Sequence, residues 1–550
     1  MTSRRNFLRN AALLAASAGA PSIAMKAAGL SAGSSSDAQA PADSNARFKN
    51  TYVKNVFVTE NEFRNARPSI TPSPGFDMAR EILPVPFWEG NPVAAEMYWK
   101  AWEIAFRNIK DPAPASGFIS SYLDTAYNGN IFMWDSAFIT MFARYGSRAY
   151  PFQKTLDNFY AKQHPDGFIC REIWGDSGED CFHRYDPTST GPNIIPWSEI
   201  EYYHHFGDLD RIHKIFPVLV AYYQWLRLNR TWQDGSYWSS GWGTGMDNQP
   251  RVHKNYNPIF SHGHMTWLDT CLQQLFIGKI LVDFGFYTER WQEIEDIEDE
   301  TKFLKKFIKE KLWDPKTSFF YDKYADGSRG NFMGIGAFWA LWTDILEKQE
   351  LDSFVKHLVN KDTFSRPHPV ASMPANHEKY QSDGRYWQGG VWAPTNYMII
   401  SGLRFKGYHD VAFDIAGRHY KKVAEVFRKT GTFWEYYSPE TPDQGFLARP
   451  DFVGWTGLVP VSVLFEGIFG IKAAVTSKTL NWDVHLTDAH GIDKYPFGKD
   501  NLLNLKCNAR KNAGHKPLIE IQSDTELTLN YSWKGGKDSM KIVPGINQNF

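Results

Sequence analysis

The chain has 550 residues, of which 43% are hydrophobic, and its 60 basic and 61 acidic side chains give a formal net charge of -1. This balance provides no basic surface of the kind that binds nucleic acid or an anionic membrane, so neither partner is expected. The aromatic content of 16% excludes disorder over most of the length. Aromatic side chains in such number either fill a thick core or line a cleft for flat apolar faces, such as those of sugars.

The start of the chain, residues 1–28, predicts an export signal. Arg4 and Arg5 precede a short apolar run at 11–20 that is rich in small residues. This order is typical of a signal peptide, and the paired arginines resemble a twin-arginine signal. The run is too short to span a bilayer and no other stretch reaches spanning length, so the mature chain is expected to have no membrane span. We expect a periplasmic or secreted protein with a polar linker at 29–50.

The central part of the chain predicts a helical domain. Residues 51–88 contain several prolines and are expected to form an N-terminal arm, whereas apolar side chains recur at helical spacing from 89 to 474. Long loops rich in Gly, Pro, Trp and Asp separate the helical stretches, at 163–193, 232–263, 367–394 and 431–457. Loops of that length in a compact domain are usually functional. The pattern predicts about twelve helices in a closed ring around a cleft.

The pattern changes to short strands near the end of the chain. Apolar and polar residues alternate at 480–486, and again at 518–521 and 527–531. Such alternation predicts half-buried strands joined by polar turns. We therefore expect a mainly helical protein with a small C-terminal β-domain at 475–550.

The sequence does not indicate a metal site or an organic cofactor. The four cysteines are widely and irregularly spaced, at Cys170, Cys181, Cys271 and Cys507. No paired cysteine motif exists, and His164 and His183 lack the tight spacing of metal ligands with the two nearest cysteines. No loop has the oxygen-ligand spacing of an EF-hand, so a structural calcium ion has no support either. Buried thiols, or at most one disulfide, are expected.

Two segments in the first half of the domain bear candidate ligands for sugar hydroxyls. Asp135 follows Trp134 at the predicted start of a helix, where it either binds a hydroxyl or caps the helix; both interpretations stay open. Arg171 and Glu172 lie in the first long loop. Carboxylates and guanidinium groups suit the hydroxyls of a pyranose.

The second long loop contains a candidate general acid, Asp247. It lies in a glycine-rich stretch from Trp242 to Arg251, beside Met246. Desolvation there would raise the pKa of the carboxyl and keep a proton available near neutrality, which a general acid requires. The alternative is an aspartate that stabilises a turn, which is common in any protein.

The last two long loops combine aromatic residues with polar groups. Trp387 and Trp392 flank Gln388 and a glycine pair that begins at Gly389, so that the backbone can approach a ligand while rings stack on it. Core packing is the alternative for the two tryptophans.

Glu435 in the fourth loop lies among four aromatic residues, including Trp434. A carboxylate there is costly unless it hydrogen-bonds water or substrate, which is the setting for a base that activates water. A buried acid paired with an arginine is the alternative, whereas Glu440 looks like an ordinary turn residue.

These motifs occur in a recognisable order: Trp134-Asp135-Ser136, Gly245-Met246-Asp247, the stretch from Tyr386 to Tyr397, and the stretch from Glu435 to Thr441. The series resembles glycoside hydrolase family 63, the group of processing α-glucosidases and mannosylglycerate hydrolases, and more loosely trehalase. The similarity extends from about Pro84 to Ile471, which is consistent with one large domain. The resemblance implies an (α/α)6 barrel.

The resemblance also implies inverting cleavage of an α-glycosidic bond, with Asp247 as general acid and Glu435 as general base. The chain departs from the family pattern at Asn248-Gln249 and at Gln388-Gly389-Gly390. These departures affect the substrate more than the reaction.

We therefore expect a glycosidase that acts on an α-glucoside or a related oligosaccharide. Its two carboxyls should lie about 6.5–9.5 Å apart. The candidate sugar platforms are Trp134, Trp242, Trp387, Trp392 and Trp434, and the candidate polar partners are Asp135, Arg171, Glu172, Gln388 and Gly389. Two other classes stay open: a helical-toroid polysaccharide lyase, and a carbohydrate-binding relative without activity.

Overall fold

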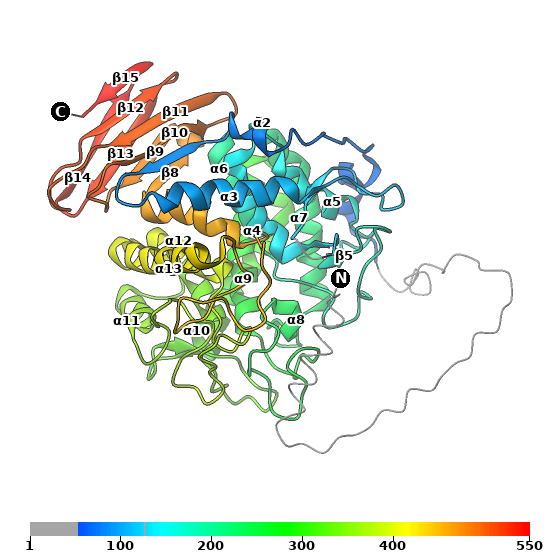
Figure 1. Cartoon of the computed structure of the whole chain (residues 1–550). Coiled ribbons are helices and arrows are strands. Elements are labelled where there is room, and N and C mark those ends of the chain that lie inside the picture. Colours follow the sequence, from blue (N-terminus) through cyan, green and yellow to red (C-terminus); the bar gives the residue numbers. More distant parts are fainter. Residues whose placement is uncertain (1–52, 126–127, 550) are drawn as a thin grey trace.

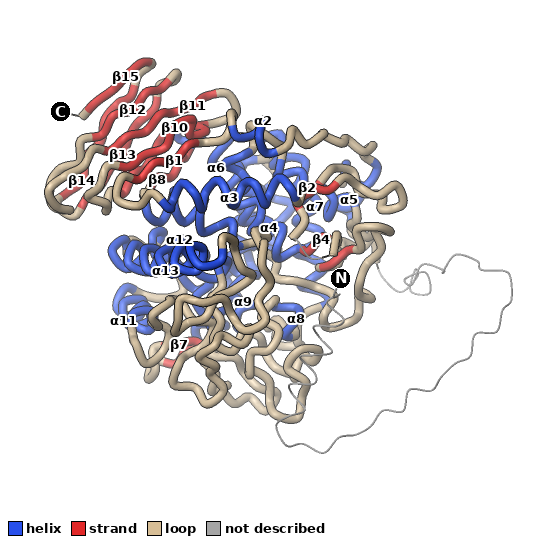
Figure 2. Tube along the Cα trace, viewed as in Figure 1, coloured by secondary structure: helices blue, strands red, loops and turns tan. Residues whose placement is uncertain are grey.

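The computed structural model describes residues 53–125 and 128–549, and combines a ring of helices with a C-terminal β region (Figures 1 and 2). The predicted export signal at 1–28 and the linker at 29–50 lie outside these described residues. Within them, no helix combines the length and the apolar character that crossing a membrane requires.

Six helical segments of the described chain form an inner ring. They are α4 (Met133–Ala143), α6 (Ile195–Phe206), α9 (Leu268–Tyr287), the 3-10 helix η7 (Ile335–Trp342), α12 (Ala393–Phe405) and the π-helix η9 (Val459–Ile468). Consecutive segments pack against each other, and the last meets the first. Every residue of α4 and η9 is buried. This explains why apolar residues occur all around both helices instead of on one face.

A second layer of helices surrounds this ring. It consists of α3 (Val93–Arg107), the short α5 (Asp157–Ala161), α7 (Leu209–Asn229), α10 (Glu295–Lys311), α11 (Lys348–Val359) and α13 (His409–Thr430). Along the chain these outer helices alternate with the inner ones. In α13, Ala412, Ile415 and Ala416 are buried at helical spacing, and Gly431 ends the helix with a φ of 72°. The predicted mainly helical architecture is confirmed, and the alternation fits an (α/α)6 barrel.

The C-terminal β region consists of two sheets with the orders β1-β10-β11-β12-β15 and β14-β13-β9-β8. The strands are β1 (Val85–Trp88), β8 (Ile471–Ala474), β9 (Thr479–Asp483), β10 (His490–Phe497), β11 (Asn501–Cys507), β12 (Ile519–Ser523), β13 (Leu527–Trp533), β14 (Gly536–Ile542) and β15 (Gly545–Gln548). The expected β region is therefore present. Its edge strand β1 comes from the N-terminal arm and pairs antiparallel with β10.

The β region packs on the C-terminal end of α12 and along the first half of α13. The Asp483 carboxylate lies 3.3 Å from the Arg404 guanidinium and 2.8 Å from the His409 ring. Trp88 packs against Tyr420 and Phe469 with ring centroids 6.2 Å and 6.1 Å apart. These contacts leave the opposite, N-terminal ends of the inner helices open to the long loops.

Candidate active site

A pocket lies where the long loops meet the starts of the inner helices. Its lining residues are Phe132, Trp134, Asp135, Arg171, Gly191, Pro192, Trp242, Gly245, Asp247, Tyr386 and Trp455. Most of these residues lie within a few positions of the first turn of α4, α6, α12 or the 3-10 helix η8 (Thr456–Leu458). Five of the sequence-predicted site residues, Asp247 among them, are thus brought together from distant parts of the chain.

The loop that bears Asp247 is shaped by a tight turn. The short helix α8 (Gly241–Thr244) is capped by Ser240, whose Oγ accepts a hydrogen bond from the Gly243 amide at 3.0 Å. Gly245 then adopts a φ of 71°, and a Cβ there would lie 3.4 Å from the indole of Trp134. The positive φ favours glycine at this position, whereas the Trp134 indole would be at ordinary contact distance from a Cβ. The turn brings the Asp247 side chain, with 7% of its surface exposed, to the pocket wall.

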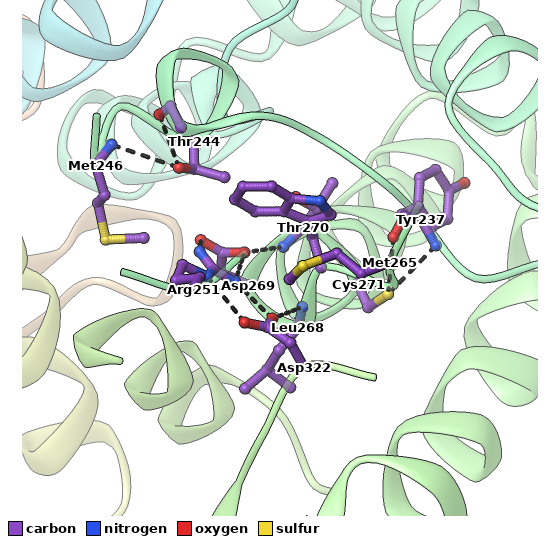
Figure 3. Close-up of polar contacts among 12 residues, drawn as sticks. Tyr237, Thr244, Met246, Arg251, Met265, Leu268, Asp269, Thr270, Cys271 and Asp322 are labelled. Carbon is purple, nitrogen blue, oxygen red and sulfur yellow. Dashed lines mark hydrogen bonds and ion pairs between the residues drawn. The ribbon is translucent and has the colours of Figure 1, made fainter. Parts of the chain in front are cut away.

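A buried ion cluster supports this loop from behind (Figure 3). The Arg251 guanidinium makes two hydrogen bonds to Asp269, at 2.7 and 2.8 Å, and two to Asp322, at 3.0 and 2.7 Å. It also lies 4.5 Å from the ring centre of Trp267. Burial lowers the Arg251 pKa, but the two carboxylates outweigh this effect and raise the pKa, so the cation stays charged.

The Arg251 cluster was missed by the sequence analysis. Arg251 lies only four residues after Asp247, but Asp269 comes from the first turn of α9 and Asp322 follows the strand β7 (Phe319–Phe320). Nothing in their spacing predicts that they meet. The cluster fixes the end of the Asp247 loop to α9.

Arg171 faces the pocket from the position directly before a short strand of a two-stranded sheet. The strand β5 (Glu172–Ile173) pairs with β4 (Ile131–Phe132), directly before α4. The Arg171 Nε donates to the Thr188 carbonyl at 2.6 Å, and Nη1 lies 3.8 Å from the Glu172 carboxylate. Its Nη2 is buried and has no hydrogen-bond partner among the described residues. Glu172 accepts a hydrogen bond from Asn130 at 3.1 Å and does not line the pocket.

The other predicted sugar-binding residues that line the pocket are Trp134, Asp135 and Trp242. Trp134 is buried and its Nε1 has no hydrogen-bond partner in the described part of the chain, whereas Trp242 is half-buried with Phe260 edge-on at 4.8 Å. Asp135 lies in the first turn of α4, but the N-cap residue is Phe132. Asp135 therefore does not occupy the capping position, and it lines the pocket instead.

Glu435 lies next to the pocket and is not among its lining residues. It is 3% exposed, its amide donates to the Arg449 carbonyl at 2.9 Å, and its carbonyl accepts from the Trp455 indole at 2.8 Å. Trp455 is part of the pocket wall. The following residue, Tyr436, packs edge-on against Tyr386, another wall residue, at 5.5 Å. The loop that bears Glu435 is thus attached to the pocket at two points.

The tryptophans of the third loop occupy core positions. Trp387 and Trp392 are 1% and 0% exposed and stack on each other with ring centroids 4.1 Å apart and an interplanar angle of 1°. Trp392 also stacks on Tyr436 at 4.4 Å. This burial favours core packing for both rings over an open sugar platform. The loop instead presents Tyr386 to the pocket, a residue that the sequence analysis did not single out.

The remaining residues that were predicted to bind sugar do not line this pocket either. The Gln388 Nε2 donates to the Asn248 carbonyl at 3.0 Å, and the Gly389 amide donates to the Ser372 hydroxyl at 3.0 Å. Gly389 has a φ of 121°, which explains the glycine. Trp434 is half-buried and lines a separate depression on the surface of its loop.

A larger cavity lies at the opposite ends of the inner helices, beside the β region. Aromatic residues such as Trp197 and Trp342 line it, together with charged groups. Several of these groups are already paired, because Lys472 lies 2.9 Å from Glu201 and Arg404 pairs with Asp483. Neither Asp247 nor Glu435 lines this cavity.

Within the described residues, no group of three or more His, Cys, Asp or Glu side chains could hold a metal ion. His164 instead pairs with Asp180, at 2.8 Å between Nε2 and Oδ2. All four cysteines are free thiols, and three of them are buried.

The helical domain is similar to known glycoside hydrolases. Residues 128–456 match the profile of the mannosylglycerate hydrolase MGH1-like glycoside hydrolase domain. An uncharacterized protein of Borreliella burgdorferi is 23% identical over 71% of this chain and 82% of its own length. A probable mannosyl-oligosaccharide glucosidase of Schizosaccharomyces pombe is also 23% identical, over 46% of this chain and 34% of its own length.

Among solved structures, the GH63 mannosylglycerate hydrolase of Thermus thermophilus in complex with glucose superimposes with a TM-score of 0.53 at 18% identity. The match covers 66% of this chain and 99% of that one. At this identity it supports the fold.

Proposed function

Because the chain belongs to the mannosylglycerate hydrolase MGH1-like group of glycoside hydrolase family 63 and is a glycosidase, we propose that it cleaves an α-glycosidic bond with inversion. The substrate is an α-glucoside or a related oligosaccharide. The observation that carries the proposal is the position of Asp247, a buried carboxyl at the wall of an aromatic pocket to which the Glu435 loop is attached.

Asp247 is the general acid. It lines the pocket with Trp134 and Gly245, where the sugar would exclude water from the carboxyl. Desolvation favours the protonated form, which can donate to the leaving oxygen. The Arg251 cluster holds the far end of the loop in place, so that the carboxyl does not have to be ordered when substrate binds.

Glu435 is the general base. An inverting enzyme needs a carboxylate that removes a proton from water on the face of the sugar opposite the acid, with about 6.5–9.5 Å between the carboxyls. The hydrogen bond from Trp455 and the contact of Tyr436 with Tyr386 support a base loop held at the pocket wall. The water would attack the anomeric carbon while Asp247 protonates the leaving group.

The pocket also offers groups that suit a sugar. Trp134 and Trp242 provide aromatic faces, and Asp135 provides a carboxylate for hydroxyl groups. The Arg171 Nη2 and the Trp134 Nε1 are buried donors without a partner in the described chain, which a ligand oxygen would satisfy.

Arg171 supports a second candidate substrate, a mannoside with an acidic aglycone such as mannosylglycerate. Relatives from Rubrobacter radiotolerans and Thermus thermophilus are named mannosylglycerate hydrolase. A carboxylate would pair with the Arg171 Nη2 as a charge-assisted acceptor. A lyase acting on uronates has less support, because the pocket combines this one arginine with two aspartates.

The test uses the Asp247→Asn and Glu435→Gln variants with nitrophenyl α-glucoside and α-mannoside, and with the corresponding disaccharides. We expect both variants to lose disaccharide turnover by about a thousandfold or more while sugar binding, measured by calorimetry, is retained. Asp247→Asn should keep more activity on a dinitrophenyl glycoside, because that leaving group needs no proton. Wild-type binding without any turnover would identify a carbohydrate-binding relative instead.

We also propose that the enzyme is exported by means of a twin-arginine signal that contains Arg4 and Arg5. Replacement of Arg4 and Arg5 by lysine should retain the protein, with its leader, in the cytoplasm of the producing bacterium. The N-terminus of the periplasmic or secreted wild-type protein, determined by mass spectrometry, gives the cleavage point. An equal distribution of wild type and variant would contradict the proposal.

A further inference from the structure

We propose that Asn248 is a positioning residue that holds Tyr386 in the pocket and thereby couples the acid loop to the base loop. The inference rests on the proposed function, because it takes Asp247 as the acid and Glu435 as the base. Asn248 directly follows Asp247 and is half-buried. Sequence analysis found only that this position departs from the family pattern.

Asn248 binds a turn that is far away in the sequence. Its Oδ1 accepts a hydrogen bond from the Trp387 amide at 2.8 Å, and its Nδ2 donates to the Arg385 carbonyl at 3.4 Å. These two groups belong to the peptide units on either side of Tyr386. The Asn248 carbonyl also accepts from the Gln388 side chain at 3.0 Å. One asparagine therefore fixes the whole turn against the acid loop.

Tyr386 needs such fixation because of its backbone conformation. Its φ is 57°, in the left-handed region that residues other than glycine seldom adopt. A conformation of this kind persists only where the surroundings impose it. The Tyr386 carbonyl also accepts hydrogen bonds from the Gly390 amide at 3.1 Å and the Trp392 indole at 3.3 Å. The hydrogen bonds from Asn248 hold the two peptide groups beside Tyr386, which would otherwise rotate to relieve the unfavourable φ.

The Tyr386 side chain contacts the loop that bears Glu435. It lines the pocket with Asp247 and packs edge-on against Trp392 at 5.0 Å and Tyr436 at 5.5 Å. Tyr436 directly follows Glu435. A continuous chain of contacts therefore joins the residue after the acid to the residue after the base. If Tyr386 rotated, the wall between the two loops would change shape.

Placement of this kind affects the rate more than the affinity. A displacement of about 1 Å at the reacting groups can cost about a hundredfold in rate. Without the Asn248 side chain, the Trp387 amide loses its acceptor and the turn can relax to a negative φ. We therefore expect Asn248→Ala to lower kcat more than it raises KM.

A double-mutant cycle tests whether Asn248 acts through Tyr386. The variants are Asn248→Ala, Tyr386→Ala and the double variant, assayed on whichever of nitrophenyl α-glucoside and α-mannoside the wild type cleaves faster. Each single variant should lower kcat/KM by about 10- to 100-fold, and the double variant should be no slower than Tyr386→Ala. Asn248→Asp keeps the acceptor for the Trp387 amide and should recover part of kcat.

The matched control is Asn257→Ala in the same long loop. The Asn257 side chain accepts hydrogen bonds from the Ile259 and Phe260 amides, at 2.8 and 3.2 Å, within its own turn. Its removal should leave kcat/KM at the wild-type value. Should Asn248→Ala fail to fold, Asn248→Ser replaces it, because that side chain is too short to reach both peptide groups.

Fully additive losses in the double variant, or wild-type kinetics for Asn248→Ala, would overturn the inference while the glycosidase mechanism stands. Absence of turnover in the wild type would instead overturn the proposed function. A crystal structure of Asn248→Ala then decides the inference alone: Tyr386 leaving the left-handed region supports it, and an unchanged Tyr386 refutes it.

Discussion

The indole N–H of Trp455 donates a hydrogen bond to the backbone carbonyl of Glu435 at 2.8 Å, and the same indole forms part of the wall around Asp247. A residue that lines the same pocket as Asp247 thus fixes the loop of Glu435. The two carboxylate loops are 188 positions apart, from 247 to 435, and only a closed ring of helices brings their anchors to one wall.

The first prediction concerns this hydrogen bond. Trp455→Phe keeps most of the ring in the wall but removes the donor to Glu435. We expect kcat to fall about tenfold with little change in KM, because the base moves while the sugar still binds. Steady-state kinetics on a nitrophenyl α-glycoside measure the effect. A change confined to KM would place Trp455 in substrate binding alone.

The second prediction separates wall residues from core residues. Trp392→Ala removes a ring that is 0% exposed, which should cost about 3–5 kcal/mol in the free energy of unfolding. Trp242 is only half-buried, so Trp242→Ala should cost clearly less stability than Trp392→Ala, and it should raise KM about fivefold to tenfold because a sugar loses an aromatic contact. Urea unfolding and kinetics distinguish the two, and equal destabilisation by both variants would refute the separation.

The third prediction concerns the buried Arg251 cluster at the end of the Asp247 loop. Arg251→Ala leaves the carboxylates of Asp269 and Asp322 buried without their cation, which should cost about 3–5 kcal/mol. Lys302→Ala removes an exposed cation from the outer helix α10 and should leave the unfolding curve unchanged. Thermal unfolding of both variants checks the contrast. A stable Arg251→Ala enzyme would show that water replaces the cation.

The fourth prediction is a loss of stability in acid, caused by buried histidines. His368 Nε2 and His419 Nδ1 lie 2.8 Å apart, and burial lowers the pKa of His419 to about 3 and that of His368 well below its usual value. In the unfolded chain both imidazoles titrate at about pH 6.5. Their neutral forms therefore contribute stability above that pH, and this stability is lost as the pH falls toward the folded pKa values.

The unfolding temperature should therefore drop steeply between about pH 6.5 and about pH 4. His419→Gln keeps a hydrogen-bonding side chain but cannot titrate, so its drop should be shallower. Calorimetry of both proteins over this range gives the comparison. Parallel pH profiles would assign the acid sensitivity to other groups.

Much of the fold was predictable because its signals are local. Helical spacing in α13 and strand alternation in β9 reflect burial on one side of each element, which sequence periodicity records. The meeting of Arg251 with Asp322 has no such signal, because it depends on how distant elements pack.

The site was predictable in part for the same reason. Asp247 and Trp242 were identified from one glycine-rich stretch and both line the pocket. Trp387 and Tyr386 are adjacent, yet the first is buried in a stack and the second faces the pocket. Tyr386 adopts a left-handed conformation of which the sequence gives no sign, so the sequence did not indicate which of the two side chains faces the pocket.

The most direct test of the mechanism follows the anomeric configuration of the product. Proton NMR spectra recorded during the first turnovers of an α-glycoside show which anomer appears before mutarotation. If Asp247 protonates the leaving group while Glu435 activates water on the opposite face, the β-anomer appears first. Initial release of the α-anomer would mean retention, and would contradict an acid and a base acting on opposite faces of the sugar.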